Sequence, residues 1–327
     1  MRVLVTGGAG YIGSHTVRLL LAQGHDVWVY DNLSTGHRAS VPADRLIVAD
    51  LRDAARLDHV FVAHRIEAVI HFAASALVPE SVRRPDLYYQ NNVVASLALL
   101  ETLRCHGVGR LVFSSTCATY GIPAVVPIDE DTPQRPINPY GNTKLAIEHA
   151  ILDHAAAFGW SVALLRYFNA AGAHPDGSLG EDHDPETHLI PLVLQVALGQ
   201  RSAVQIFGTD YATPDGTCVR DYIHVEDLAR AHLLALEKAQ PGRPLVCNLG
   251  TGQGHSVREV LQAAEQVVGR PIPAVESPRR EGDPAALVAR ADRARTLLGW
   301  TPAQSDLTSI VRSAWNWHRQ HPAGYDD

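Results

Sequence analysis

The first half of the chain alternates short apolar runs rich in β-branched residues with longer segments of helical periodicity. The apolar runs, which we interpret as strands, are RVLVTG (2–7), DVWVYD (26–31), RLIVAD (45–50), EAVIHFAA (67–74), RLVFSST (110–116) and SVALLRYFN (161–169). Helices are expected at 13–24, 92–107 and 143–159, and each of these segments ends at a glycine, as helices often do. Strands and helices that alternate in this way indicate an α/β fold with a doubly wound parallel sheet.

The composition changes near residue 174, which indicates a second, smaller domain. The segment HPDGSLGEDHDPETH (174–188) is rich in Gly, Pro, Asp and His, and a helix and a short strand are expected after it. Residues 220–250 then have the pattern of a strand, a helix and a strand of the sheet. We therefore expect the sheet domain to comprise 1–173 and 220–250, and a smaller mixed α/β substrate domain to comprise 174–219 and 251–327.

Composition and charge narrow the range of partners. The chain has 327 residues, is 46% hydrophobic and carries a formal net charge of −7. Because no run rich in lysine or arginine accompanies this charge, we expect a small-molecule partner and no nucleic acid. The four cysteines are scattered, the N-terminus lacks a signal-peptide pattern, and no apolar run is long enough to span a membrane. These features predict a soluble, cytoplasmic protein without a membrane partner.

A glycine-rich loop stands at the start of the first expected helix. In VLVTGGAGYIG (3–13), Gly7, Gly10 and Gly13 directly follow a strand. Glycines at these places allow a tight turn, close approach of the backbone to a pyrophosphate, and close packing of helix on strand. Asp31 ends the next strand, where an acidic residue binds the ribose hydroxyls of a dinucleotide. The pattern predicts a Rossmann-type NAD site, and Asp31 disfavours NADP because a carboxylate would repel a 2′-phosphate.

The stretch NPYGNTK (138–144) places Tyr140 four residues before Lys144, on one face of a helix whose cap and first turn suit Asn138 and Pro139. The chain has only two lysines, Lys144 and Lys238, against twenty-six arginines. A phenol is about a thousandth ionised at neutral pH, and a nearby cation favours its ionised form. The pair therefore predicts a tyrosine that transfers protons beside a bound cofactor.

Longer stretches resemble one family. The glycine loop, Asp31, FSST (113–116) and YGNTK (140–144) follow the order typical of extended short-chain dehydrogenases/reductases. HFAA (71–74), YYQNNV (88–93), LLRYFNAAGAHPDG (164–177), DGTCVRDYIHVEDLA (215–229) and RREGD (279–283) resemble the UDP-hexose 4-epimerases of that family, nearly end to end. The resemblance implies an isomerase of galactose metabolism that interconverts UDP-glucose and UDP-galactose at C4, through a 4-keto intermediate and transient reduction of bound NAD.

The resemblance also implies roles for individual residues. Tyr140 would be the catalytic base, Lys144 would hold the nicotinamide ribose and lower the pKa of Tyr140, and the Thr116 hydroxyl would bond the sugar 4-oxygen. The implied cofactor-binding residues are Gly7, Gly10, Tyr11, Ile12, Gly13, Asp31, Asn32, Asp50, Leu51, Phe72, Ala73, Ala74, Asn91, Thr116, Tyr140, Lys144 and Phe168. The implied substrate-binding residues are Thr116, Tyr140, Asn169, His188, Leu189, Gln205, Phe207, Arg220, Arg280, Asp283 and Leu287.

Three positions need comment. Asp50 suits a turn or helix cap as well as a cofactor contact. Ala76 stands where many members of the family carry a lysine near the cofactor. Leu287 stands where a bulky residue is associated with exclusion of N-acetylated sugars and a small one with tolerance, so the sugar range remains open.

Alternative functions remain. A 4-epimerase of another UDP-sugar, such as a UDP-N-acetylhexosamine or a UDP-pentose, would share these motifs. A sugar-nucleotide 4,6-dehydratase would need an Asp-Glu pair where this chain has Cys117 and Ala118. A non-catalytic dinucleotide-binding sensor could dispense with Tyr140 and Lys144. The family is commonly dimeric, here through 93–103 and 143–157, so a homodimer is expected.

Two further segments invite functional interpretations that we disfavour. EDHDPETH (181–188) gathers carboxylates and histidines, but its spacing fits no standard ligand pattern, so we expect a solvated acidic stretch and no metal. GTGQG (250–254) could be a phosphate loop, but a structural turn before a helix capped by Ser256 is favoured. Cys117 is expected to be a small core residue.

Overall fold

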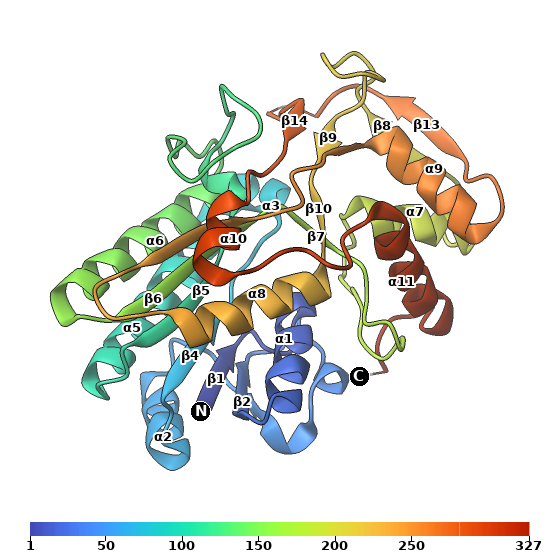
Figure 1. The fold of residues 1–327 in the computed structure, drawn as a ribbon. Coiled ribbons are helices and arrows are strands. Elements are labelled where there is room, and N and C mark those ends of the chain that lie inside the picture. Colours follow the sequence, from blue (N-terminus) through green and yellow to red (C-terminus); the bar gives the residue numbers. More distant parts are fainter. Residues whose placement is uncertain (281, 327) are drawn as a thin grey trace.

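The computed structural model describes residues 1–280 and 282–326 and has a large parallel sheet at its centre (Figure 1). The strands of this sheet, in spatial order, are β11 (Leu245–Leu249), β6 (Ser161–Tyr167), β5 (Arg110–Thr116), β4 (Ala68–His71), β1 (Arg2–Thr6), β2 (Asp26–Asp31) and β3 (Leu46–Val48). All neighbouring pairs in the sheet are parallel. The expected α/β fold with a doubly wound parallel sheet is confirmed.

Helices cover both faces of this sheet. One face carries α1 (Tyr11–Ala22), α8 (Val225–Lys238) and α10 (Asp292–Leu298), and the other carries α2 (Ala54–His64), α5 (Ala95–Cys105) and α6 (Pro139–Phe158). Short segments between β4 and α5 form α3 (Val78–Arg83), α4 (Pro85–Tyr88) and a π-helical turn (Tyr89–Val94). In the described part of the chain, 3₁₀ turns lie at Arg38–Ser40, Ala43–Arg45 and Cys117–Thr119.

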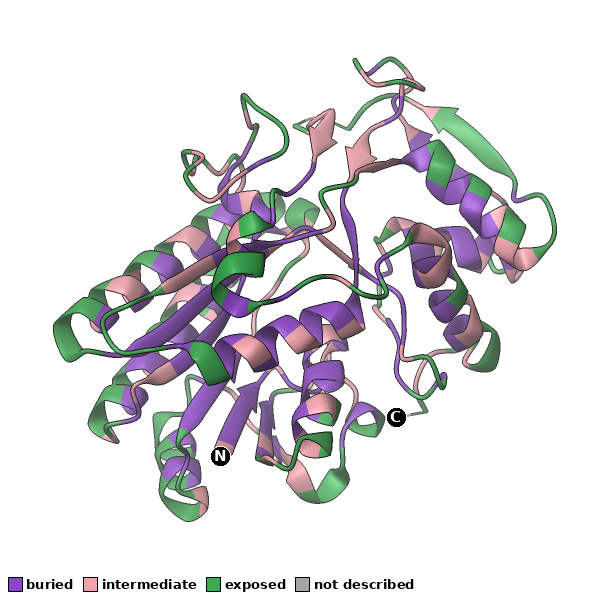
Figure 2. Cartoon of the chain, viewed as in Figure 1, coloured by how far each residue is buried: buried purple, intermediate pink, exposed green. Residues whose placement is uncertain are grey.

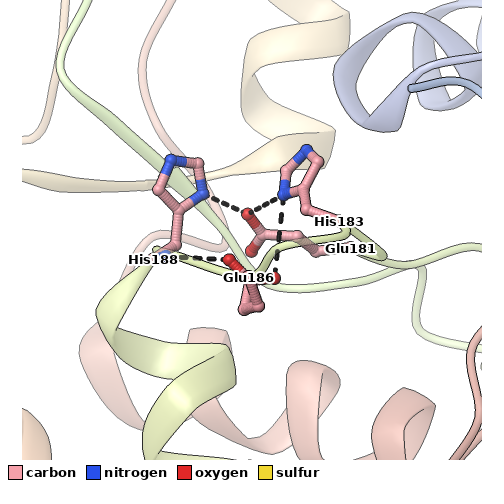
Figure 3. A group of neighbouring side chains, drawn as sticks. All are labelled: Glu181, His183, Glu186 and His188. Carbon is pink, nitrogen blue, oxygen red and sulfur yellow. Dashed lines mark hydrogen bonds and ion pairs between the residues drawn. The ribbon is translucent and has the colours of Figure 1, made fainter. Parts of the chain in front are cut away.

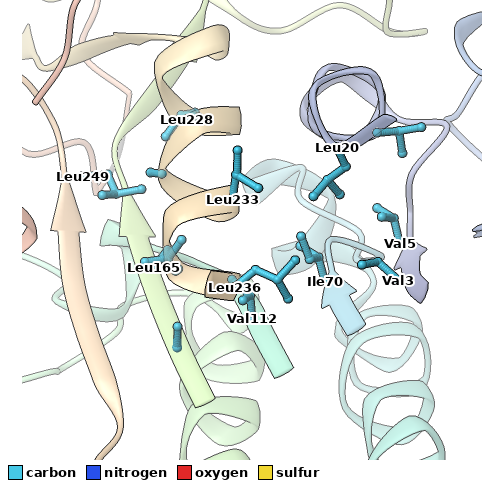
Figure 4. Packing of buried hydrophobic residues seen from close by; sticks show 14 of the residues in the cluster. Val3, Val5, Leu20, Ile70, Val112, Leu165, Leu228, Leu233, Leu236 and Leu249 are labelled. Carbon is cyan, nitrogen blue, oxygen red and sulfur yellow. The ribbon is translucent and has the colours of Figure 1, made fainter. Parts of the chain in front are cut away.

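Alternation along the strands explains why the sheet is covered on both faces. In β1, Val3 and Val5 join the core beneath α1 and α8, whereas Leu4 between them joins the core beneath α2 and α5. Figure 4 shows the first of these cores, with Leu20 of α1 directed at the strands and Leu236 of α8 beside Val112. The strands are accordingly buried almost throughout, while the outer faces of the helices are exposed (Figure 2).

A smaller group of elements stands beside the sheet (Figure 1). It contains α7 (Leu189–Ala197), α9 (Val257–Val268) and α11 (Leu307–Gln320), whose apolar faces share one hydrophobic core. Its strands pair as β8 (Val204–Phe207) with β13 (Ala274–Ser277), β10 (Tyr222–His224) with β7 (Asn169–Ala171), and β9 (Val219–Arg220) with β12 (His255–Ser256) and β14 (Ala286–Leu287).

The chain passes between the two groups of elements more than once. β11 forms the edge of the large sheet, where it pairs with β6. Ala294 and Leu298 of α10 also pack into the core of the large sheet, although the division inferred from sequence assigns them to the smaller domain. The exact domain boundaries therefore remain a proposal. No helix in the described ranges is both long enough and apolar enough to cross a membrane.

The turn expected at 250–254 is present. Ser256 caps α9 in a capping box with Glu259, and backbone N–H groups of Thr251 and Gly252 donate to the carboxylate of Asp221 at 2.9 and 3.1 Å. The N–H groups of the turn and the carboxylate of Asp221 thus hydrogen-bond to one another within the protein, as expected of a structural turn.

Stability is expected to fall as the pH drops below about 6.5, in part because of His232 on α8. Its ring is fully buried, Nδ1 bonds the Leu228 carbonyl at 2.8 Å, and Nε2 has no partner among the described residues. Burial lowers the pKa of His232 to about 4. Between this value and the unfolded value of about 6.5 the unfolded chain binds more protons, so acid removes up to about 3 kcal/mol of stability.

Urea unfolding near pH 7 and near pH 4.5 checks this. Between these two pH values, the free energy of unfolding of His232→Met should fall by about 2–3 kcal/mol less than that of the wild type. Burial also lowers the pKa values of His71 and His224. The free energy of unfolding of both the wild type and His232→Met is therefore still expected to fall with decreasing pH. Equal losses in the two proteins would contradict the role of His232.

Candidate functional site

A cavity of about 360 Å³ opens where the strands of the large sheet end. The carboxyl edge of an open α/β sheet is where ligands bind. Every cofactor-binding residue implied by the resemblance lines the cavity, namely Gly7, Gly10, Tyr11, Ile12, Gly13, Asp31, Asn32, Asp50, Leu51, Phe72, Ala73, Ala74, Asn91, Thr116, Tyr140, Lys144 and Phe168. Asn169, His188 and Ala76 line it as well.

Two glycines of the loop, Gly7 and Gly13, leave no room for a side chain. Gly7 has φ +69°, and a Cβ there would lie 2.5 Å from the Ala73 nitrogen. A Cβ at Gly13 would lie 2.3 Å from the Gly7 carbonyl oxygen. Helix α1 begins at Tyr11, directly after the loop, so its N-terminal N–H groups stand at the cavity wall. This cradle fits the pyrophosphate of a dinucleotide.

Two substitutions in this loop are expected to separate folding from cofactor binding. Gly13→Ala brings its methyl group within 2.3 Å of the Gly7 oxygen and should cost about 1–3 kcal/mol of stability. At Gly10, φ is −79°, and among described residues a Cβ meets only the Gly7 oxygen, at 3.4 Å. Gly10→Ala should therefore keep its stability but lose bound NAD, because its methyl group occupies the pyrophosphate cradle.

Urea unfolding and the amount of NAD released on denaturation measure the two effects. If Gly10→Ala retained as much NAD as the wild type, the pyrophosphate would not lie against this loop.

Asp31 presents its carboxylate to the cavity from the end of β2. Oδ2 accepts the Ala9 N–H at 3.0 Å and Oδ1 accepts the Leu33 N–H at 2.8 Å. Burial raises the pKa of Asp31, and these hydrogen bonds oppose the rise. Each oxygen keeps further accepting capacity, which suits the two hydroxyls of a ribose.

Asp50 makes the local turn considered from sequence and also lines the cavity. Its carboxylate accepts from the Arg52 backbone at 2.9 Å and from the Arg52 guanidinium at 2.8 and 2.7 Å, which makes a local turn. The hydrogen bond with the Arg52 side chain lowers the pKa of Asp50 to about 2. Asp50 nevertheless lines the cavity, so the turn positions it there.

Tyr140 and Lys144 lie on the first turns of α6, which begins where the sequence predicts. The Asn138 side chain caps the helix by accepting the Gly141 N–H at 2.8 Å, and Pro139 occupies its first position. Both Tyr140 and Lys144 line the cavity.

Burial dominates the electrostatics of this pair. Lys144 Nζ donates to the Ser114 carbonyl at 2.9 Å and lies 4.8 Å from the centre of the Phe113 ring. Burial lowers the pKa of Lys144 to about 7, although the charge of Glu148 opposes this. Burial also raises the pKa of Tyr140. The lowering of the Tyr140 pKa expected from Lys144 thus does not outweigh desolvation in this structure.

Thr116 ends β5 at the same cavity. Its hydroxyl oxygen accepts the Ala118 N–H at 3.1 Å and so caps the turn Cys117–Thr119. A hydrogen bond with Thr116 also opposes the rise in the pKa of Tyr140. Cys117 is buried, and burial raises the pKa of its thiol to about 12, as expected of a core cysteine.

Sequence reasoning missed one supporting device, the π-helical turn Tyr89–Val94 before α5. Asn92 in this turn accepts the Ser75 N–H at 2.8 Å and donates to the Ser75 carbonyl at 3.0 Å. The turn thereby fixes the loop after β4 beside Asn91, whose side chain donates to the Ser75 hydroxyl at 3.0 Å. The adjacent asparagines in YYQNNV were the only signal for it.

Most of the residues implied for the UDP moiety lie outside the cavity. Leu189, Gln205, Phe207, Arg220, Arg280, Asp283 and Leu287 belong to α7 and the small strands or to the loop between β13 and β14. Arg220 forms an ion pair with Asp283, and the Arg280 guanidinium lies 3.9 Å from the centre of the Phe207 ring. Leu287 pairs in register with Arg220.

The segment 181–188 is not the solvated acidic stretch expected from sequence. The side chains of Glu181 and Glu186 are each only 3% exposed. Burial lowers the pKa of His183, but the hydrogen bonds that its ring donates to the Glu181 and Glu186 carboxylates outweigh this and raise the pKa to about 10. The expectation failed because α11, far along the chain, packs over the segment: Trp317 Nε1 donates to the Glu181 carbonyl at 3.3 Å.

Comparison with known proteins places this site in a family. The model of the NAD dependent epimerase/dehydratase family matches residues 3–250. UDP-glucose 4-epimerase from Halalkalibacterium halodurans is 55% identical over 99% of this chain and 98% of its own length. The structure of UDP-glucose 4-epimerase from Brucella ovis in complex with NAD has a TM-score of 0.93 at 50% identity, covering 96% of this chain and 97% of its own.

The structure of the Bifidobacterium longum enzyme in complex with NAD+ and UDP has a TM-score of 0.94 at 42% identity, covering 99% of this chain and 100% of its own. The resemblance expected from sequence is confirmed over the full length. The chain belongs to the NAD dependent epimerase/dehydratase family, and within it to the group of the UDP-glucose 4-epimerases.

Proposed function

We propose that this protein interconverts UDP-glucose and UDP-galactose by epimerising C4 of the hexose, with NAD as its bound cofactor. The observation that carries the proposal is that Tyr140, Lys144 and Thr116 line the same cavity as the glycine loop and Asp31. Relatives named UDP-glucose 4-epimerase at 50–55% identity favour UDP-hexoses over the alternative UDP-sugars. The retained Tyr140 and Lys144 disfavour a non-catalytic sensor.

The chain's own residues handle the proton and the sugar oxygen. Tyr140 accepts the proton of the sugar 4-hydroxyl and later returns it, while the Thr116 hydroxyl holds the 4-oxygen. NAD, when bound, supplies a reversible hydride acceptor for C4 and the positive charge of its nicotinamide ring. Lys144 adds its ammonium group to the same region, where a cation favours the ionised phenol against the desolvation described above.

UDP is expected to be held by the small strands beside the cavity. Arg220 and Arg280 offer planar guanidinium groups that suit a diphosphate. Leu287 packs against the cluster that contains Cys117 and Phe168, next to Thr116 and the cavity. This position supports a role for Leu287 in deciding whether an N-acetylated sugar fits.

The test is incubation of the purified protein with UDP-galactose, without added cofactor or reductant, followed by proton NMR of the anomeric signals. Formation of UDP-glucose is expected. Parallel incubation with UDP-N-acetylgalactosamine reports on the room beside Leu287. If UDP-galactose remained unchanged while intact NAD was bound, the assignment to UDP-hexoses would fail, and UDP-pentoses would be tried next.

A homodimer in the cytoplasm is part of the proposal. Tyr89 and Val94 of the π-helical turn are 45% and 42% exposed, and Leu97 in the first turn of α5 is 45% exposed. Exposed apolar side chains gathered beside α5 and α6 suit a contact between two copies of this chain. Sedimentation velocity of the wild type and of Leu97→Glu tests this, with dissociation expected in the variant.

A further inference from the structure

Four side chains of one short segment converge beside the cavity. Glu181, His183, Glu186 and His188 each offer a ligand atom, and these atoms all lie within 4.8 Å of one another (Figure 3). The two carboxylates are almost fully buried, whereas the rings of His183 and His188 are 27% and 50% exposed. Two buried carboxylates therefore stand beside two imidazoles that are partly open to solvent.

We propose that this cluster binds one Zn²⁺ ion or a similar first-row transition-metal ion, through Nδ1 of both histidines and one oxygen of each glutamate. Imidazole nitrogen favours such ions over Mg²⁺ and Ca²⁺, which prefer oxygen ligands alone. The charges of Glu181 and Glu186 balance a divalent cation, and four ligands satisfy the tetrahedral geometry of structural zinc sites.

The distances suit a tetrahedral site. Bonds of about 2.0–2.2 Å from zinc to nitrogen and oxygen place neighbouring ligand atoms about 3.3–3.6 Å apart. His183 Nδ1 lies 3.3 Å from Glu181 Oε1 and 3.7 Å from Glu186 Oε2. His188 Nδ1 lies closer to Glu181, as a hydrogen-bonded partner, so its half-exposed ring must swing outward to admit the ion.

The backbone around the cluster is already held in place. Glu186 Oε1 accepts the N–H groups of Thr187 and His188 at 2.7 and 2.8 Å, and it is Glu186 Oε2 that faces His183. Trp317 anchors the Glu181 carbonyl from α11. A metal site binds its ion more tightly when further hydrogen bonds to neighbouring groups hold the ligand residues in position.

The ion would stabilise the part of the cavity wall that the 181–188 segment forms. His183, Asp184 and Pro185 line the cavity, and the His183 ring lies 6.3 Å from that of Tyr11, with the rings edge to face. Tyr11 itself belongs to the cofactor loop and donates to the Gly172 carbonyl at 2.6 Å. A metal ion at this junction therefore joins the 181–188 segment to the cofactor side of the cavity. The inference does not depend on the proposed reaction.

Metal content tests the proposal directly. The chain without an affinity tag is treated with a chelator, equilibrated with zinc sulfate, freed of excess metal by gel filtration and analysed by mass spectrometry. We expect about one zinc per chain in the wild type and at least a tenfold loss of uptake in His183→Gln and Glu186→Gln. The matched control is His106→Gln, because His106 also pairs with a carboxylate, Asp58, at 2.6 Å; this variant should keep its zinc.

Circular dichroism and bound NAD report whether each variant is folded. In the wild type loaded with Co²⁺ instead, visible absorption typical of four-coordinate cobalt is expected. If the wild type takes up no more zinc than His183→Gln, or if cobalt gives no such bands, the proposal fails. The four residues would then form only hydrogen-bonded pairs of imidazole and carboxylate. If both variants keep their zinc, the metal binds elsewhere and the proposal fails.

Discussion

Replacement of Tyr140 by phenylalanine is expected to slow epimerisation by about 10²- to 10⁴-fold, the usual contribution of a general acid–base group. The substitution removes only the phenolic hydroxyl group of Tyr140, which lines the cavity, and keeps the aromatic ring. Because burial raises the pKa of Tyr140, its environment makes ionisation costly until a cation lies beside it. The loss should therefore appear in kcat more than in KM.

The measurement is turnover of UDP-galactose followed by proton NMR, with NAD content determined on the same samples. Tyr140→Phe should retain its NAD, since the glycine loop and Asp31 are untouched. Tyr89→Phe is the control, because Tyr89 is exposed and outside the cavity lining. Loss of less than about tenfold in Tyr140→Phe would assign the proton transfer to another group.

The large sheet could be predicted from sequence because each of its strands carries its own apolar run, and a parallel sheet buries such runs on both faces. The two-residue strands β9 and β14 have no comparable signal, since tertiary contacts alone hold them in place. The π-helical turn before α5 was missed for a related reason: its first residues continue the helical pattern, and only the contacts of Asn92 reveal the wider turn.

The glycine loop could be predicted from sequence, whereas the residues that bind the cofactor stay a prediction. Gly7 and Gly13 face backbone at distances that exclude a Cβ, so the residue type itself records the constraint. The state of Glu181 was not predictable, because burial depends on Trp317, 136 residues later. The desolvation that raises the pKa of Tyr140 could not be predicted for the same reason, since it depends on the whole surrounding fold and not on Lys144 alone.

Behind the site, a buried ion pair joins α6 to the sheet. Arg166 Nε and Nη2 of β6 donate to Glu148 at 2.9 and 2.6 Å, and Arg166 Nη1 donates to the Tyr120 hydroxyl at 2.9 Å. The side chains of Arg166 and Glu148 are 5% and 1% exposed. Glu148 also accepts from Ser115, the neighbour of Thr116, and lies one turn after Lys144.

Arg166→Met is expected to destabilise the protein by about 3–5 kcal/mol, because the carboxylate of Glu148 is left buried without its counter-charge. Urea unfolding at saturating NAD measures the change. Arg104→Met is the matched control: Arg104 pairs with Glu101 at 2.6 Å on the exposed face of α5, so its loss should cost less than about 1 kcal/mol. The double variant Arg166→Met/Glu148→Leu should recover part of the stability lost in Arg166→Met, because it removes the stranded charge. If Arg166→Met were as stable as Arg104→Met, the ion pair of Arg166 and Glu148 would not be needed to hold α6, which carries Tyr140 and Lys144, against β5, which ends at Thr116.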